Sequence, residues 1–255
     1  MKVVVCYKLV PDVDSIKVNG DRTIDLGGAE WAIGQYDLNA VETAARLMET
    51  NEGSSLIALT VGGPIVENTK LRKSILSRGP QEMKAVKDAA YEKADCFAIA
   101  STLAAAIRKI GDVDLVLFGE GSGDIYAQQT GSVVGSLLGW NTLNAVNGVE
   151  VKDGKLEVSR ATEDCNEVLE VSLPAALSVT SDICVPRLAS MKDILQAGKK
   201  PFEIWAPADV AASAESKTCT ESILAPEQTD RMKVVGKADD ENHFNAVVQQ
   251  LRSFM

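Results

Sequence analysis

The chain has 255 residues, of which 45% are hydrophobic and 24% are charged, a composition typical of a globular protein with a sizeable core. Its formal net charge of −10 argues against nucleic acid and anionic lipid as partners, because an acidic surface repels both. No apolar run reaches the roughly 18 residues of a membrane span. The N-terminal run is too short for a signal peptide, so we expect a cytoplasmic protein.

Cysteine and histidine usage limits the metal-binding and catalytic chemistry that this chain could carry out. The five cysteines are widely scattered and form no Cys-x-x-Cys pair, so we expect reduced thiols and no metal site. The single histidine, His243, lies at the polar start of a helical pattern, where a solvated residue is a simpler interpretation than a catalytic base. With no second histidine, a Ser-His-Asp or Cys-His mechanism has little support. We therefore predict no catalytic residues.

The first half of the chain alternates apolar runs with amphipathic segments. Residues 2–10, rich in valine, predict a buried parallel strand, and a polar excursion follows with a turn at 19–21. A helix is predicted over 36–50, with Asp37 as a candidate N-cap. Further strands are predicted at 54–63, 82–88 and 114–119, and further helices at 67–79, 95–111 and 126–139. This spacing predicts a doubly wound, mainly parallel, Rossmann-like α/β sheet with helices on both faces.

The pattern changes after residue 140. A turn at 152–154 predicts a hairpin, and alternation followed by an apolar run over 167–182 predicts antiparallel strands added to the sheet. A short helix is predicted within 185–200, with Ser190 as its N-cap.

From about residue 201 the sequence is rich in Ala and Ser and has no clear period. A strand-like segment at 231–236 and a final helix over 241–255 follow. We divide the chain into an α/β domain of residues 1–200 and a C-terminal arm of residues 201–255. The alternative is a loosely packed extension in place of an arm that lies on another surface.

A candidate anion site follows the strand at 114–119. Ligands in open α/β sheets bind beyond the carboxyl ends of the strands, and the segment GSGDIYAQQTG (121–131) lies there. Its glycines permit positive φ and close backbone approach, and N–H groups at a helix start favour an anion. Gln128, Gln129 and Thr130 add side-chain donors without adding charge. The pattern predicts a phosphate-binding turn, with a purely structural βα turn as the alternative; no P-loop is present to support NTP hydrolysis.

Several segments together are more specific than this turn. They read CYKLVPD (6–12), QYDLNAVE (35–42), LTVGG (59–63), LRKSILSRGP (71–80), DLVLFGEGSGDIYAQQTG (114–131), VSRATEDCNEVLEVSLPA (158–175) and VPRLASMKDILQAGKKP (185–201). On these segments the chain resembles the β subunit of electron transfer flavoproteins over nearly its whole length. It is most similar to the bacterial branch associated with carnitine and nitrogen-fixation electron chains.

The resemblance implies a nucleotide-binding α/β domain whose C-terminal arm wraps an α subunit. In that family the α subunit carries FAD, and the β subunit holds AMP or, in electron-bifurcating members, a second FAD. By position, the nucleotide contacts fall on Cys6, Gly34, Gln35, Tyr36, Asp37, Gly62, Gly119, Gly121, Ser122, Gly123, Asp124, Gln128, Gln129 and Thr130. Gln128 stands where the family usually has Asn, and Gly123 to Ile125 stand where acids usually run. AMP and FAD therefore both remain open for this chain.

The resemblance also implies partners. Met191 matches the apolar anchor of a loop that docks on acyl-CoA dehydrogenases or related partners; the alternative is a surface helix packed on its own domain. The implied function is that of an electron carrier subunit, not an enzyme, in a heterodimer that relays electrons between a dehydrogenase and a quinone- or ferredoxin-linked oxidoreductase. Two alternatives are a bifurcating, NADH-oxidising subunit with FAD in β and a stand-alone nucleotide-binding regulatory protein.

Overall fold

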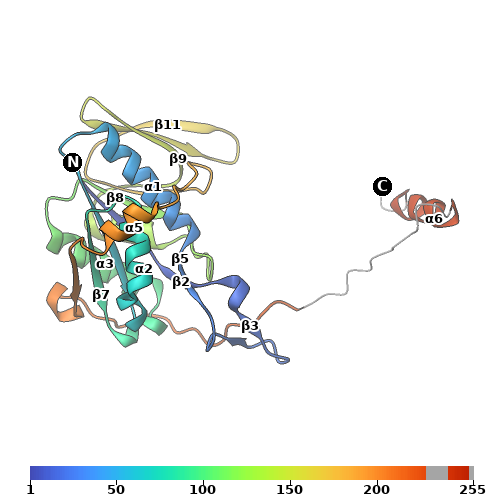
Figure 1. Ribbon diagram of the computed structural model, residues 1–255. Helices are drawn as coiled ribbons and strands as arrows, with labels where there is room; N and C mark the ends of the chain where they lie inside the picture. Colours follow the sequence, from blue (N-terminus) through green and yellow to red (C-terminus); the bar gives the residue numbers. More distant parts are fainter. Residues whose placement is uncertain (228–240, 253–255) are drawn as a thin grey trace.

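The computed structural model describes residues 1–227 and 241–252, with the side chains of 241–243 left out (Figure 1). Within these residues nine strands form the central sheet. In spatial order they are β11 (Asn166–Val171), β10 (Lys155–Ala161), β9 (Asn141–Lys152), β12 (Ala175–Val179), β8 (Leu115–Gly119), β1 (Lys2–Cys6), β6 (Ser55–Gly62), β7 (Glu82–Lys87) and β13 (Phe202–Trp205). In this spatial order, every neighbouring pair from β9 through to β13 at the far edge is parallel. Beyond β9, β10 and β11 extend the other edge with antiparallel pairs.

Helices and two small sheets surround this sheet. The α-helices are α1 (Gln35–Thr50), α2 (Thr69–Leu76), α3 (Cys96–Ile110), α4 (Thr130–Leu138), α5 (Met191–Ala197) and α6 (Glu241–Arg252). Single 3₁₀ turns are η1 (Val13–Ser15), η2 (Pro64–Glu67), η3 (Ala89–Lys93) and η4 (Pro207–Val210). The small sheets pair β2 (Leu9–Pro11) with β5 (Trp31–Ile33), and β3 (Lys17–Val18) with β4 (Ile24–Asp25).

The core has two halves, one on each face of the sheet. Successive side chains of a strand point to opposite faces, so β1 supplies both halves. Val3 and Val5 pack with residues of α1 and α2, whereas Val4 and Cys6 pack with residues of α3 and α4. Helices therefore cover both faces, and the predicted doubly wound, mainly parallel α/β fold is confirmed.

The strand order reverses between β1 and β8. From β1 the chain proceeds through α1 to β6 on one side, then returns through α3 to β8 on the other. In open α/β sheets the crevice at such a reversal, outside the carboxyl ends of the strands, is the usual ligand site. The 121–131 segment opens from β8 at this crevice.

Four local predictions are corrected. The predicted strand 2–10 is two strands, because the N–H of Lys8 leaves the sheet to bind Asp37. Asp37 is not the N-cap of α1; Gly34 is. The helix predicted at 67–79 begins only after a 3₁₀ turn, capped by Asn68.

The helix predicted at 126–139 begins at Thr130. Tyr126 and Gln128 have φ of 51° and 54°, a left-handed conformation that a right-handed helix cannot include. The residues that the sequence analysis placed inside the helix therefore form the loop in front of it.

The predicted antiparallel extension is correct for β10 and β11 but wrong for β12, which pairs parallel with β8 and β9 inside the sheet. Two other local predictions are confirmed. Asp153 and Gly154, both at positive φ, turn the chain between β9 and β10. Ser190 caps α5, with its hydroxyl accepting the N–H of Asp193. The predicted strand at 231–236 lies outside the described residues, as does the side chain of His243.

The chain stays on the sheet past residue 200. β13 pairs with β7 as the edge strand, a position that the sequence analysis missed. Beyond Val210 the chain runs along the carboxyl edge of the sheet (Figure 1): Asp95, which caps α3, accepts the N–H groups of Lys217 and Thr218 at 2.7 and 2.8 Å. None of the helices in the described part of the chain is long and apolar enough to cross a membrane.

Candidate functional site

Asp37 joins the carboxyl ends of β1 and β8. It lies in the first turn of α1, and only 6% of it is exposed. Its Oδ2 accepts the backbone N–H of Lys8 at 2.7 Å, and its Oδ1 accepts that of Gly119 at 3.3 Å. Lys8 follows β1 and Gly119 ends β8, so one carboxylate fixes the spacing of the two strand ends at the crevice.

The surroundings of Asp37 are strongly desolvated. Burial raises the pKa of Asp37 to about 7, against the opposing effect of the two N–H bonds. Burial also raises the pKa of the Cys6 thiol, and the charge of Asp37 adds to this effect. Cys6 is therefore a protonated, inert core residue at neutral pH, because the thiolate is the reactive form.

Close packing explains two of the three glycines at 119–123, Gly119 and Gly121. A Cβ on Gly119 would lie 2.6 Å from the backbone carbon of Tyr36, and one on Gly121 would lie 2.3 Å from the ring of Tyr126. Gly123 has no heavy atom within 4 Å of this position. None of the three has positive φ, so the conformational role expected of them is wrong.

The loop is tied to the strand end and to α1. The ammonium of Lys8 pairs with the carboxylate of Asp124 at 2.6 Å, and the rings of Tyr36 and Tyr126 lie 5.3 Å apart. The side-chain amide of Gln128 donates to the hydroxyl of Tyr126 at 3.4 Å. These contacts hold the exposed loop over the mouth of the crevice.

Helices α1 and α4, which pack on β8 from opposite faces of the sheet, both begin without a side-chain cap. Within residues 1–227, side chains of Asn68, Asp95 and Ser190 cap α2, α3 and α5. Gly34 and Gln129 begin α1 and α4 without a side-chain cap. The first N–H groups of a helix have no partner within it and carry a partial positive charge, so this pair of helix ends favours an anion.

The structure gathers most of the predicted site residues here and sets others apart. Around the crevice lie the starts of α1 and α4, the end of β8 and the loop, which together hold Gly34, Gln35, Tyr36, Asp37, Gly119, Gly121, Ser122, Gly123, Asp124, Gln128, Gln129 and Thr130. Gly62 ends β6, on the side of β1 away from β8. Its carbonyl accepts the N–H of Asp88. Cys6 lies in the core beneath.

Two residues that contribute to this site are not among the predicted site residues. Lys8 anchors the loop through Asp124, and the thiol of Cys96, at the start of α3, lies 3.6 Å from the hydroxyl of Thr130. No local pattern signals either residue, because their partners are far away in sequence.

A family comparison identifies this architecture. The sequence model for the electron transfer flavoprotein domain matches residues 22–210, from the β3–β4 hairpin to η4. The chain belongs to the electron transfer flavoprotein domain family. The resemblance noted in the sequence is thereby confirmed at the level of the family, and the electron transfer flavoprotein domain includes both α1 and the loop after β8. Proteins of this family are electron carriers.

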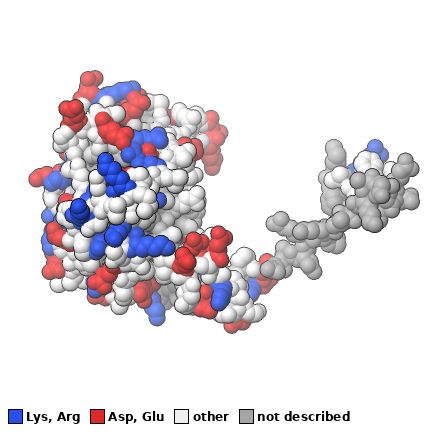
Figure 2. All heavy atoms as spheres, viewed as in Figure 1, with Lys and Arg blue, Asp and Glu red and all other residues white. Residues whose placement is uncertain are grey.

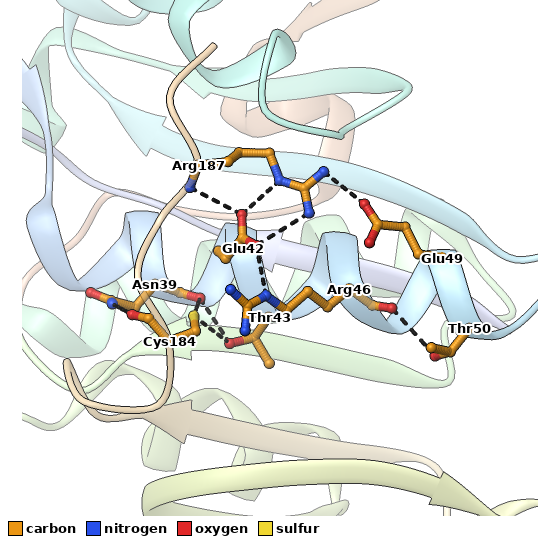
Figure 3. Close-up of polar contacts among 8 residues, drawn as sticks. All are labelled: Asn39, Glu42, Thr43, Arg46, Glu49, Thr50, Cys184 and Arg187. Atoms are coloured by element: carbon orange, nitrogen blue, oxygen red, sulfur yellow. Dashed lines mark hydrogen bonds and ion pairs between the residues drawn. The ribbon is translucent and has the colours of Figure 1, made fainter.

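A second region of this electron transfer flavoprotein domain is the segment that leads into α5. Figure 3 shows the side chains of α1 that hold it. Glu42 accepts from Arg187 and from Arg46, each at 2.7 Å, and the amide of Asn39 donates to the carbonyl of Cys184 at 2.7 Å. Burial raises the pKa of Glu42, but the bonds from Arg187 and Arg46 outweigh burial and hold this pKa below its ordinary value. Met191 follows this anchored segment and is 75% exposed.

Proposed function

We propose that this chain is the β subunit of an electron transfer flavoprotein and that it binds an adenine nucleotide, AMP or FAD, at the crevice between β1 and β8. The observation that carries the proposal is that α1 and α4, on the two faces of β8 at the strand-order reversal of an electron transfer flavoprotein domain, both begin without a side-chain cap. Free N–H groups there match the chemistry of a phosphate.

The residues at the crevice suit this ligand. The N-terminus of α4, with the side chains of Gln128, Gln129 and Thr130, would hold the phosphate or pyrophosphate, because all are neutral donors at a helix start. The start of α1, from Gly34 to Asp37, would line the other side. A flavin, when bound, supplies the electron-transfer chemistry, and the protein supplies binding and electrostatics.

The proposal includes a heterodimer. An α subunit would carry FAD, and the chain beyond Val210 would serve as the arm that contacts it, since residues 211–227 add no strand to the sheet and are mostly exposed. This start is later than the division at residue 200 drawn from the sequence. We further propose that Met191 anchors an acyl-CoA dehydrogenase-type partner, and that electrons pass between this partner and a quinone- or ferredoxin-linked oxidoreductase in the cytoplasm.

The decisive experiment is to co-express the chain with a flavin-binding α subunit, purify the complex, release its nucleotides and quantify FAD and AMP. One FAD with one AMP supports the simple carrier. Two FAD without AMP would instead make the chain a bifurcating subunit. A stable, nucleotide-loaded monomer that ignores every α subunit would overturn the proposal in favour of a stand-alone nucleotide-binding protein.

A further inference from the structure

A cavity of about 180 Å³ lies between the C-terminal end of α2 and helix α5. Its lining includes Arg78, Arg187, Lys200 and a single carboxylate, that of Asp193. Three cations therefore face one anion, in a chain whose net charge is −10. We name this cavity the notch.

One of the three cations already has carboxylate partners, and the one anion already has a hydrogen-bond partner. Arg187 binds Glu42, with its Nε at 2.7 Å, and Glu49, with its Nη1 at 2.8 Å. The carboxylate of Asp193 accepts the hydroxyl of Ser190 at 2.5 Å in the capping box of α5. Arg187 therefore adds no free charge to the notch, whereas Asp193 keeps its negative charge and offsets one of the other two cations, that of Lys200.

The other two cations have only neutral partners. The ammonium of Lys200 donates to the carbonyls of Leu76 and Pro80, each at 2.7 Å. The Nη1 of Arg78 donates to the carbonyl and hydroxyl of Ser74, at 2.6 and 2.8 Å, and its buried Nε has no hydrogen-bond partner. Within residues 1–227 and 241–252, no carboxylate forms an ion pair with either cation.

Capping of α2 accounts for only part of this charge. Arg78 and Lys200 bind carbonyls at the C-terminal end of α2, where a helix carries about half a negative charge. Asp193 offsets one of the two cations, and the one full positive charge that remains exceeds that half charge. Burial lowers the pKa of Arg78, as expected for a cation held without a counter-ion, and it lowers the pKa of Lys200 although the carboxylate of Asp193 opposes that shift. The notch therefore has unmatched positive charge.

An exposed apolar stripe lies beside the notch. Val185, Leu188, Met191 and Leu195 are 81%, 92%, 75% and 72% exposed, and Met191 and Leu195 project from α5, whose Asp193 lines the notch. Figure 2 shows Lys and Arg side chains gathered over the face that carries α2 and α5. Isolated exposed apolar residues need no explanation, but a run of them beside unmatched cations is typical of a protein-docking surface.

We propose that the notch receives an Asp or Glu carboxylate of the dehydrogenase that docks on α5, with the guanidinium of Arg78 as its main partner. This inference rests on the proposed function. Arg presents a planar fork that matches a carboxylate, and a charge beside an apolar anchor fixes the orientation in which the anchor enters its pocket. Apolar contact then supplies affinity, while the notch selects partners with an acidic residue next to the pocket.

The first test measures reduction of the flavin in the intact heterodimer by an acyl-CoA dehydrogenase, as a function of dehydrogenase concentration. Arg78→Gln should raise KM roughly tenfold with unchanged nucleotide content, and Arg78→Lys should raise it by no more than about threefold. Lys70→Gln is the matched control, because Lys70 lies on α2, the helix that precedes Arg78, is 85% exposed and lies outside the notch. Equal KM values for Arg78→Gln and Lys70→Gln would overturn the proposal.

The second test does not depend on the stability of Arg78→Gln. A carbodiimide couples an amine only to a carboxylate in contact with it, so the amine introduced by Arg78→Lys should couple to an Asp or Glu of the bound dehydrogenase, as identified by peptide mass spectrometry. High salt should remove the cross-link. Coupling only to Asp193 of the same chain would overturn the notch but leave the proposed function standing. Failure of the wild-type heterodimer to accept electrons from any dehydrogenase would overturn both.

Discussion

Arg187 surrounds the carboxylate of Glu42: its backbone N–H lies 3.1 Å and its Nε 2.7 Å from Oε2. Only 4% of Glu42 is exposed. Through this pair the middle of α1 holds the segment that precedes α5, while the first turn of α1 forms the crevice at β1 and β8. One helix therefore supports both the proposed nucleotide site and the proposed docking segment.

The pair predicts unequal effects of two similar substitutions. Glu42→Gln should lower the free energy of unfolding by about 1–3 kcal/mol, because Arg187 and Arg46 lose a buried anionic acceptor. Glu49→Gln, which removes an acceptor of the same arginine at a 60% exposed side chain, should cost less than about 1 kcal/mol. Urea unfolding of both variants measures the difference. Equal losses would show that the buried position of Glu42 carries no special weight.

Met191 predicts a loss of docking without a loss of stability. Truncation of a central apolar anchor usually costs at least about 1–2 kcal/mol of binding, because the partner's pocket is left unfilled. Met191→Ala should therefore slow electron transfer to the dehydrogenase, with flavin content and melting temperature near wild type. Val168→Ala is the control, because Val168 is 63% exposed on the edge strand β11. A large drop in melting temperature with normal turnover would make Met191 a core residue instead.

The proposed phosphate cradle predicts a loss of nucleotide. Thr130→Val combined with Gln129→Leu removes two side-chain donors at the start of α4, each worth about 1.5–3 kcal/mol if bound to a phosphate. Nucleotide recovered after dialysis should fall, as should the stability of the heterodimer. Ser136→Ala, in the last turns of the same helix, should retain wild-type occupancy. Unchanged occupancy in the double variant would place the phosphate elsewhere.

Two loop glycines predict opposite outcomes for the same substitution. Gly119→Ala forces a Cβ to within 2.6 Å of the backbone of Tyr36, so β8 or α1 must shift and the crevice with it. Gly123→Ala places its Cβ in open space. We expect Gly119→Ala to lower the melting temperature and nucleotide occupancy, and Gly123→Ala to leave both near wild type. A tolerated Gly119→Ala would contradict the close approach of α1 to β8.

Asp37 predicts a pH dependence of stability. Its pKa is raised to about 7 in the fold, above the ordinary value of 3.8, so the folded chain binds a proton more tightly than the unfolded chain. This stabilisation is complete below about pH 4 and declines as pH rises towards 7, by at most about 1.4 kcal/mol per pH unit.

Asp37→Asn isolates this contribution, because the amide does not titrate. The difference in unfolding free energy between wild type and variant, measured by urea unfolding from pH 4 to 8, should change steadily up to about pH 7 and then level off. A difference that is constant across this range would show that the carboxyl group of Asp37 does not titrate there.

The sequence by itself determined the elements and their class. Apolar runs at 54–63 and 114–119, each followed by a helical pattern, were sufficient for a parallel sheet, because burial on both faces leaves a recognisable composition. The β9–β10 turn and the cap of α5 were also readable, since Asp153, Gly154 and Ser190 act on backbone within a few residues of themselves.

Only the tertiary structure decided the contacts that build the candidate site. The sequence suggests that Asp37 caps a helix, but its carboxylate oxygens accept the backbone N–H groups of Lys8 and Gly119. These two residues are far apart in the sequence and come together only when the chain folds. The unmatched charge of Arg78 is likewise invisible until α5 closes the notch beside it. A local sequence pattern indicates which face of a helix or strand is buried. The partner of a buried charge depends on strand order and helix placement, which the whole chain settles when it packs.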